Sequence, residues 1–217
     1  FSFSLYKDEA IGIVVPTYTW GLPSLVCDFL EKLEIEFAGT PYVYFVATCG
    51  ATPGQIGYFA NCYMEQKGLP IAAQFSIKMP DTWTPIFDLS NKRKVEKINR
   101  AAEPQIDRMI SKIKNRETGN FMKNKVPLFA AKAFYRFGYD MIRKTKNFYV
   151  EDTCIGCGLC AEKCPVNAIK IQNGKPVWVR EQCVMCLKCL HHCPKFSIQY
   201  GRHTKKHGQY RNPNVRG

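Results

Sequence analysis

The chain has 217 residues and a mass of 24.8 kDa, which is enough for one full domain and one small domain. Apolar residues make up 46% of it, so a packed core is expected, but no stretch of 18 apolar residues occurs and no transmembrane segment is predicted. The net charge of +13 is divided into −5 over residues 1–89 and +18 over residues 90–217. Such a basic surface is expected to attract acidic partner proteins.

Residues 1–89 alternate between strand-like and helical patterns. β-Branched and aromatic runs predict the strands, and apolar residues at helical spacing predict the helices between them. Strands that alternate with helices indicate an α/β domain with a parallel sheet and helices on its faces. The predicted strands are 11–16, 42–50 and 71–77, and the predicted helices are 22–33 and 55–67.

The loops after the first two strands are candidates for a binding site, because parallel sheets bind ligands beyond the carboxyl ends of their strands. Residues 16–23 offer two aromatic side chains on a turn, and residues 48–54 offer small residues with free backbone N–H groups. Together they are suited to a flat ring with polar edges, stacked on Tyr18 or Trp20. In the alternative interpretation, both aromatic residues simply pack on the edge of the sheet.

Residues 90–146 are predicted to form a helical linker. An apolar stripe follows residues 95–113, with basic residues on the other side, and Pro104 marks a possible kink. A second apolar and basic helix is expected over residues 128–146. These helices are interpreted as a clamp between two domains; their charge also leaves membrane-surface or nucleic-acid binding open.

Two cysteine runs form the most specific motif in the chain. CIGCGLCAEKCP begins at Cys154 and CVMCLKCLHHCP begins at Cys183, so the pattern recurs after 29 residues. Each run has the C-x2-C-x2-C-x3-C-P spacing of bacterial iron–sulfur proteins, in which three cysteines hold one 4Fe-4S cluster and the fourth binds the other cluster. The predicted ligand sets are Cys154, Cys157, Cys160 and Cys193 for one cluster, and Cys183, Cys186, Cys189 and Cys164 for the other.

Two alternatives compete for these cysteines, a zinc site and disulfide bonds. A zinc site would leave the third cysteine of each run without a role, and disulfides bridge poorly at this spacing. Gly156 and Gly158 suit positive φ in the first loop, and the bulkier second loop is expected to be stiffer and drier. His191 and His192 are predicted to be solvated side chains without a ligand role.

The cysteine runs lie in a predicted α+β ferredoxin-like domain over residues 147–201. A hairpin is expected around Asn173-Gly174, followed by an extended basic tail over residues 202–217. With 11 cysteines and no visible signal peptide, the protein is expected in a reducing compartment, the cytoplasm.

The loops PTYTWGLP and ATCGATPG, followed by the two cysteine runs, resemble the flavodoxin–ferredoxin fusion proteins known as EFR-type ferredoxins. The resemblance covers nearly the whole chain. It implies that the two loops flank the flavin of FMN, with ring contacts from Thr17, Tyr18, Trp20, Thr48, Cys49 and Gly50.

The chain departs from that family at its N-terminal end. Flavodoxins begin with a strand and a loop that cradles the FMN phosphate at a helix N-terminus, and nothing before Ile11 supplies such a unit. The flavodoxin-like sheet is therefore expected to be incomplete, as in a fragment, and the missing phosphate loop argues against FMN binding by this chain.

The predicted function is electron transfer through two 4Fe-4S clusters, to or from an FMN that converts between one-electron and two-electron chemistry. No acid–base pair or nucleophile triad is discernible, so any substrate reaction would take place at the flavin. The alternatives are a carrier whose N-terminal half is a scaffold without cofactor and, less favoured, a basic iron–sulfur protein that binds nucleic acid.

Overall fold

The structure is a computed structural model that describes residues 1–6, 8–123 and 126–215. The chain divides into two compact units, the first made of Phe1–Pro80 and Lys97–Tyr139, the second of Asp81–Glu96 and Asp140–Gly217. These boundaries differ from the predicted ones at 89 and 146. The predicted linker is divided between the units, and residues 81–89 belong with the cysteine runs.

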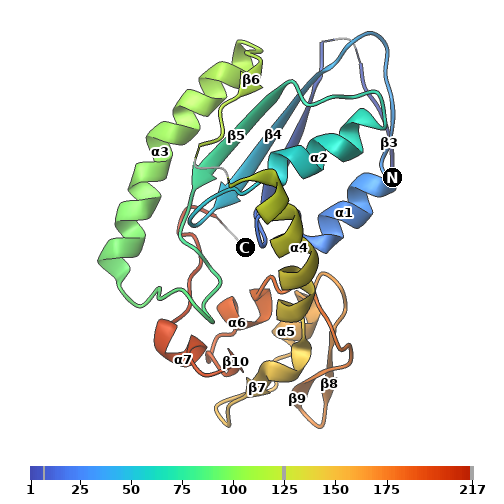
Figure 1. Cartoon of the computed structure of the whole chain (residues 1–217). Helices are drawn as coiled ribbons and strands as arrows, with labels where there is room; N and C mark the ends of the chain where they lie inside the picture. The colour runs from blue at the N-terminus through green and yellow to red at the C-terminus, as the bar shows by residue number, and fades with distance from the viewer. Residues whose placement is uncertain (7, 124–125, 216–217) are drawn as a thin grey trace. The chain divides into compact units, whose positions relative to one another are not determined.

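The first unit contains a parallel sheet with the strand order β2-β4-β5-β6 (Figure 1). Its strands are β2 (Ala10–Pro16), β4 (Tyr42–Cys49), β5 (Ala73–Lys78) and the short β6 (Gly119–Asn120). All neighbouring strands pair in parallel, with Val14 opposite Val46 and Val46 opposite Phe75. The predicted α/β class and the three predicted strands are confirmed. A flavodoxin-like fold stays a prediction.

Alternate residues of β4 pack on opposite faces of this sheet. Val43 and Phe45 join a core with helices α1 (Ser24–Glu31) and α2 (Ile56–Glu65). Tyr42 and Val46 join a second core with α3 (Lys92–Lys114). Figure 1 shows α1 and α2 on one side of the sheet and α3 on the other. Because β4 is covered on both faces, its sequence is a continuous apolar run.

Helix α3 continues without interruption through Pro104. Ala102, Ile106 and Met109 pack on the sheet, so this part of the predicted linker covers one face of the α/β unit. The helix ends at Lys114, and Gly119 begins β6. An amphipathic stripe fits a domain clamp and a sheet cover equally well, which is why the pattern misled.

One further feature of the first unit was not predicted. Strand β1 (Ser2–Ser4) pairs in parallel with β3 (Glu34–Glu36) in a separate small sheet. Within the described part of the segment between β1 and β2, no helix forms, so the strand–loop–helix unit of a phosphate site is not seen there. Helix α4 (Leu128–Ile142) lies where the second linker helix was expected.

The second unit consists of two antiparallel strand pairs and short helices. Strand β7 (Phe148–Val150) pairs with β10 (Ile198–Tyr200), and β8 (Ile169–Gln172) pairs with β9 (Lys175–Trp178). Asn173 and Gly174 have φ of 49° and 74°, as a type I′ hairpin turn requires, so the predicted hairpin is confirmed. The helical elements are η1 (Thr145–Asn147), α5 (Leu159–Glu162), α6 (Lys188–His191) and α7 (Thr204–His207).

The predicted extended tail is wrong for its first part. Residues Thr204–His207 form α7, and the Thr204 hydroxyl is buried between the Tyr200 N–H and the Gln199 side chain. Gln209 then donates hydrogen bonds to the carbonyls of Leu190 (2.6 Å) and Cys193 (2.9 Å). The polar composition suggested a solvated tail, but Thr204 bonds to residues of β10 and Gln209 bonds to the backbone of the second cysteine run. Across the described residues, no helix combines the length and apolar character that crossing a bilayer demands.

The packing of α1 gives a test of the first core. Leu30 is fully buried whereas Leu25, on the same helix, is 41% exposed. Leu30→Ala should lower the free energy of unfolding by about 2–5 kcal/mol, because it leaves a cavity in the core. Urea unfolding followed by far-UV circular dichroism measures this loss. Leu25→Ala is the matched control, and an equal loss in both variants would contradict the assigned core.

Candidate metal centre

Two cavities in the second unit are lined by cysteines from both runs. They enclose about 360 and 320 Å³ including their open mouths, so they are similar in size. Each cavity receives three cysteines from one run and the fourth from the other run. Cys154, Cys157, Cys160 and Cys193 line the first cavity, and Cys183, Cys186, Cys189 and Cys164 line the second. The structure thus brings together the two sets that the spacing predicts.

The two cysteine loops share one backbone conformation. Gly156 and Gly158 have φ of 67° and 77°, and the residues 29 positions later, Met185 and Leu187, both have φ of 52°. Left-handed backbone is easy for glycine but costs other residues about 1–2 kcal/mol. At Gly156 an added Cβ would lie 2.7 Å from the Gly174 carbonyl oxygen, so this loop needs glycine for space as well.

The crossing cysteines are held by equivalent turns. The backbone N–H of Ala168 donates to Cys164 Sγ (3.2 Å), and that of Ser197 donates to Cys193 Sγ (3.3 Å). A third N–H, from Met185, donates to Cys183 Sγ (3.3 Å). N–H groups aimed at sulfur stabilise thiolates, so the backbone prepares these side chains as anionic ligands.

Burial opposes ionisation of the cysteine thiols. It raises the pKa of Cys183 to about 11, and it also raises the pKa values of Cys160, Cys186 and Cys189, with neighbouring cysteine thiolates adding to the effect. Thiols gathered in this way need a compensating positive charge to become thiolates. Soft sulfur donors with N–H groups directed at them fit an iron–sulfur cluster, which supplies that charge.

A single metal ion fits the cysteines less well. Zn²⁺ would draw its ligand sulfurs to about 2.3 Å from one point. Over the part of the chain that the structure describes, no group of three or more His, Cys, Asp or Glu side chains is arranged to hold one ion. The cavities are therefore better suited to a larger group that keeps its ligands apart.

The two cavities differ in their exposure to water. Val184, Met185 and Leu187 of the second loop are each at most 5% exposed and contribute to an apolar surround. Ile155, in the first loop, is 60% exposed, and Cys157 is exposed as well. The second cavity is thus more shielded, as its sequence suggested.

His191 is buried, so the prediction that it is solvated is wrong. Its Nε2–H donates to the Thr82 carbonyl (2.9 Å), and its Nδ1 accepts from the Tyr210 N–H (3.2 Å). This arrangement requires the neutral tautomer, and burial lowers the pKa of His191 accordingly. No sequence pattern indicates this contact, because Thr82 lies 109 residues away. His192 instead bonds through Nδ1 to the Lys188 carbonyl (3.1 Å).

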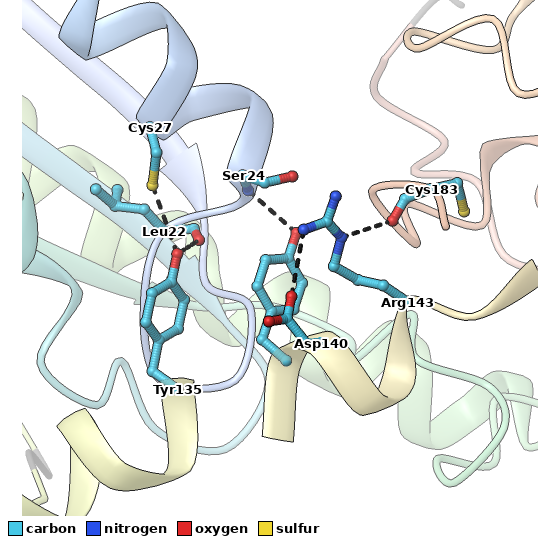
Figure 2. Close-up of polar contacts among 8 residues, drawn as sticks. Leu22, Ser24, Cys27, Tyr135, Asp140, Arg143 and Cys183 are labelled. Carbon is cyan, nitrogen blue, oxygen red and sulfur yellow. Dashed lines mark hydrogen bonds and ion pairs between the residues drawn. The ribbon is translucent and has the colours of Figure 1, made fainter. Parts of the chain in front are cut away.

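Arg143 anchors the beginning of the second run. Its Nε donates to the Cys183 carbonyl (3.0 Å), and the Cys183 N–H donates to the Arg143 carbonyl (3.0 Å). Figure 2 shows the guanidinium between Cys183 and Asp140, whose carboxylate lies 3.5 Å from it. A basic residue in a predicted linker carries no sequence signal for this role.

The residues predicted to contact a flavin ring come from two loops that meet. The N–H of Thr17 donates to the Thr48 carbonyl (2.8 Å), and Cys49 is buried at the end of β4, with Gly50 next in the chain. The hydroxyls of Thr17 and Thr19 are buried and have no hydrogen-bond partner within the described structure. Such orphan hydroxyls fit a ligand with a polar edge.

Aromatic side chains of α4 cover the first of these loops. The ring centroids of Trp20 and Phe134 are 4.5 Å apart, and those of Tyr18 and Tyr139 are 6.2 Å apart. Figure 2 shows Tyr135 directed at Leu22 and Cys27; its hydroxyl donates to the Leu22 carbonyl (2.5 Å). The loop aromatics thus pack on α4, whereas the alternative interpretation placed them on the edge of the sheet.

Residues 146–194 match the family of 4Fe-4S dicluster domains. The chain therefore carries a ferredoxin-type iron–sulfur domain that binds 4Fe-4S. Among known proteins, Ferredoxin-2 of Desulfomicrobium norvegicum is 58% identical to it over 26 residues, which cover 12% of this chain and 44% of that ferredoxin. The matched part is thus less than half of that relative's length. No solved structure matches the chain. The ferredoxin part of the predicted resemblance is supported, and the flavodoxin part stays a prediction.

The first cysteine loop provides a paired test. Gly156→Ala and Gly158→Ala both place a side chain at positive φ. The new Cβ at position 156 would press against the Gly174 backbone, whereas no atom lies within 4 Å of a Cβ at position 158. We expect Gly156→Ala to lose its visible iron–sulfur absorbance faster under a chelator, and Gly158→Ala to stay closer to the parent. Equal rates of loss would contradict the tight packing at Gly156.

Proposed function

We propose that the chain is an electron carrier that passes single electrons through two 4Fe-4S clusters, one in each cysteine-lined cavity. The observation that carries the proposal is the gathering of four cysteines, three from one run and one from the other, around each of two similar cavities. A bound 4Fe-4S cluster supplies one-electron redox chemistry. We place the carrier in a reducing compartment such as the cytoplasm, because the cysteine ligands must stay reduced to bind a cluster.

The residues around the cavities support this role in two ways. Left-handed loop residues and N–H donors to sulfur fix the ligands, so little rearrangement is needed when the charge of a site changes. Burial of Val184 and Leu187 limits water at the second cavity, while the first is more open. Solvent access and hydrogen bonds to sulfur tune cluster potentials, so the two sites are expected to differ in potential.

A second candidate adds a flavin in the first unit, exchanging electrons with the clusters. The orphan hydroxyls of Thr17 and Thr19, on the loop that meets Thr48, favour it. Against it stands the packing of Trp20 on Phe134. The remaining alternative is a scaffold domain without cofactor.

The crossing of ligands between runs predicts how cysteine substitutions combine. Cys157→Ala with Cys193→Ala should remove ligands of one cluster and leave about four iron atoms per chain. Cys157→Ala with Cys164→Ala should remove one ligand from each cluster, so almost no iron should remain bound to the chain. Iron and sulfide analysis, with electron paramagnetic resonance of the reduced protein, distinguishes these outcomes.

Cys62→Ala with Cys27→Ala is the control, because both residues lie outside the cysteine cavities on helices of the first unit. This pair should keep about eight iron atoms per chain. If both test pairs lost the same amount of iron, the crosswise assignment would be rejected.

The flavin candidate has a separate test. The protein is purified without oxygen, its flavin is released by acid, and FMN is quantified beside iron. About one FMN with about eight iron atoms per chain is the result expected of a flavin–cluster converter. The same iron content without flavin, even after incubation with FMN, would leave a two-cluster carrier with a scaffold domain.

A further inference from the structure

The second unit also has a groove that none of the cysteines lines. It encloses about 1410 Å³ including its open mouth, several times the size of either cysteine cavity. Its walls come from residues 144–150, which include β7, and from residues 176–182, which include most of β9. The Thr145 hydroxyl bonds to the Arg180 carbonyl, and the Thr145 N–H bonds to the Glu181 carbonyl (2.8 Å), so these two segments are joined.

The charge of the groove is mainly positive. Lys144, Lys146 and Arg180 line it, against a single acidic side chain, Glu181. All three basic residues are exposed, and none of them forms an ion pair with another described residue. Positive side chains that lack acidic partners and share one concave surface favour a ligand with several carboxylates.

Apolar side chains lie between these charges. Tyr149, Val177 and Val179 line the groove and are 42%, 39% and 43% exposed, respectively. Exposed apolar residues rimmed by charge are typical of surfaces that bind proteins, because the apolar area contributes affinity and the charges contribute orientation and rate. A small inorganic anion would use the charges but leave the apolar residues exposed.

The walls of the groove are also walls of the cysteine cavities. Phe148 and Trp178 stack with centroids 4.6 Å apart, and both line the groove and the second cysteine cavity. Pro176 lines the groove and the first cavity. A molecule seated in the groove would therefore be separated from each cavity by one layer of side chains.

We propose that this groove is the docking site for an acidic surface segment of a redox partner protein. The inference rests on the proposed function, since it gives the clusters a place to exchange electrons. Lys144, Lys146 and Arg180 pair with carboxylates of the segment, Tyr149, Val177 and Val179 contact its apolar side chains, and the Phe148–Trp178 pair lies between the bound segment and the second cluster.

The test uses the full-length protein with its iron and a short fluorescein-labelled peptide in which pairs of Glu alternate with single Val residues. The groove variant carries Lys144→Glu, Lys146→Glu and Arg180→Glu. The matched control carries Lys97→Glu, Lys114→Glu and Arg108→Glu, three exposed residues of α3 that do not line the groove. Both variants change the net charge equally, so only the position of the charges differs.

Fluorescence anisotropy at moderate salt should show binding of the peptide weakened about tenfold or more by the groove variant, and by at most about threefold by the control. An equal effect of both variants would show a response to net charge alone and would overturn the proposal. A labelled oligothymidylate serves as the nucleic-acid probe. If the parent protein bound it more tightly than the peptide and the groove variant did not bind it, the proposal would be overturned in favour of nucleic acid.

Iron content and the visible spectrum are recorded on the same samples. A protein that binds the peptide at the groove but holds no clusters would refute the proposed function and leave the binding site standing. A protein with intact clusters and no binding of the peptide would refute the groove alone.

Discussion

The exchange of one cysteine between the two runs is the constraint on which the second unit depends. Cys164 leaves the first run to line the second cavity, and Cys193 makes the opposite crossing. Neither run is a complete site without the other, so the two loops must fold as a pair. The strand pairs reflect this, because β8 and β10 each begin a few residues after a crossing cysteine. The position of β8 thus fixes Cys164 at the second cavity, and the position of β10 fixes Cys193 at the first.

The two halves of the repeat keep one backbone but differ in side chains. Where the first loop has Gly156 and Gly158, the second holds Met185 and Leu187 in the same left-handed conformation. The strain of these two residues is offset by burial, since a fully buried apolar side chain contributes about 1.5–3 kcal/mol and each left-handed residue costs about 1–2 kcal/mol. The side chains that dry the second loop therefore also offset the strain of its backbone.

The sequence predicted best what local geometry determines. Cysteine spacing, the Asn173-Gly174 turn and the alternation of strands with helices all act within a few residues, and each led to the right element. Contacts such as that of His191 with Thr82, or of Gln209 with the Leu190 carbonyl, join distant segments and have no periodic signature. The amphipathic stripe of α3 showed an apolar face but not what the face would cover. That choice depends on the sheet, which sequence periodicity does not describe.

The loop after β2 balances two kinds of interaction. Trp20 packs on Phe134, and such an aromatic pair stabilises the fold by about 0.5–1.5 kcal/mol beyond the effect of its buried area. The Thr17 and Thr19 hydroxyls of the same loop are buried without partners in the described structure, which costs about 1–3 kcal/mol each. The cost of the two unpaired hydroxyls exceeds the gain from the aromatic pair. Packing and hydrogen bonding therefore oppose each other in this loop.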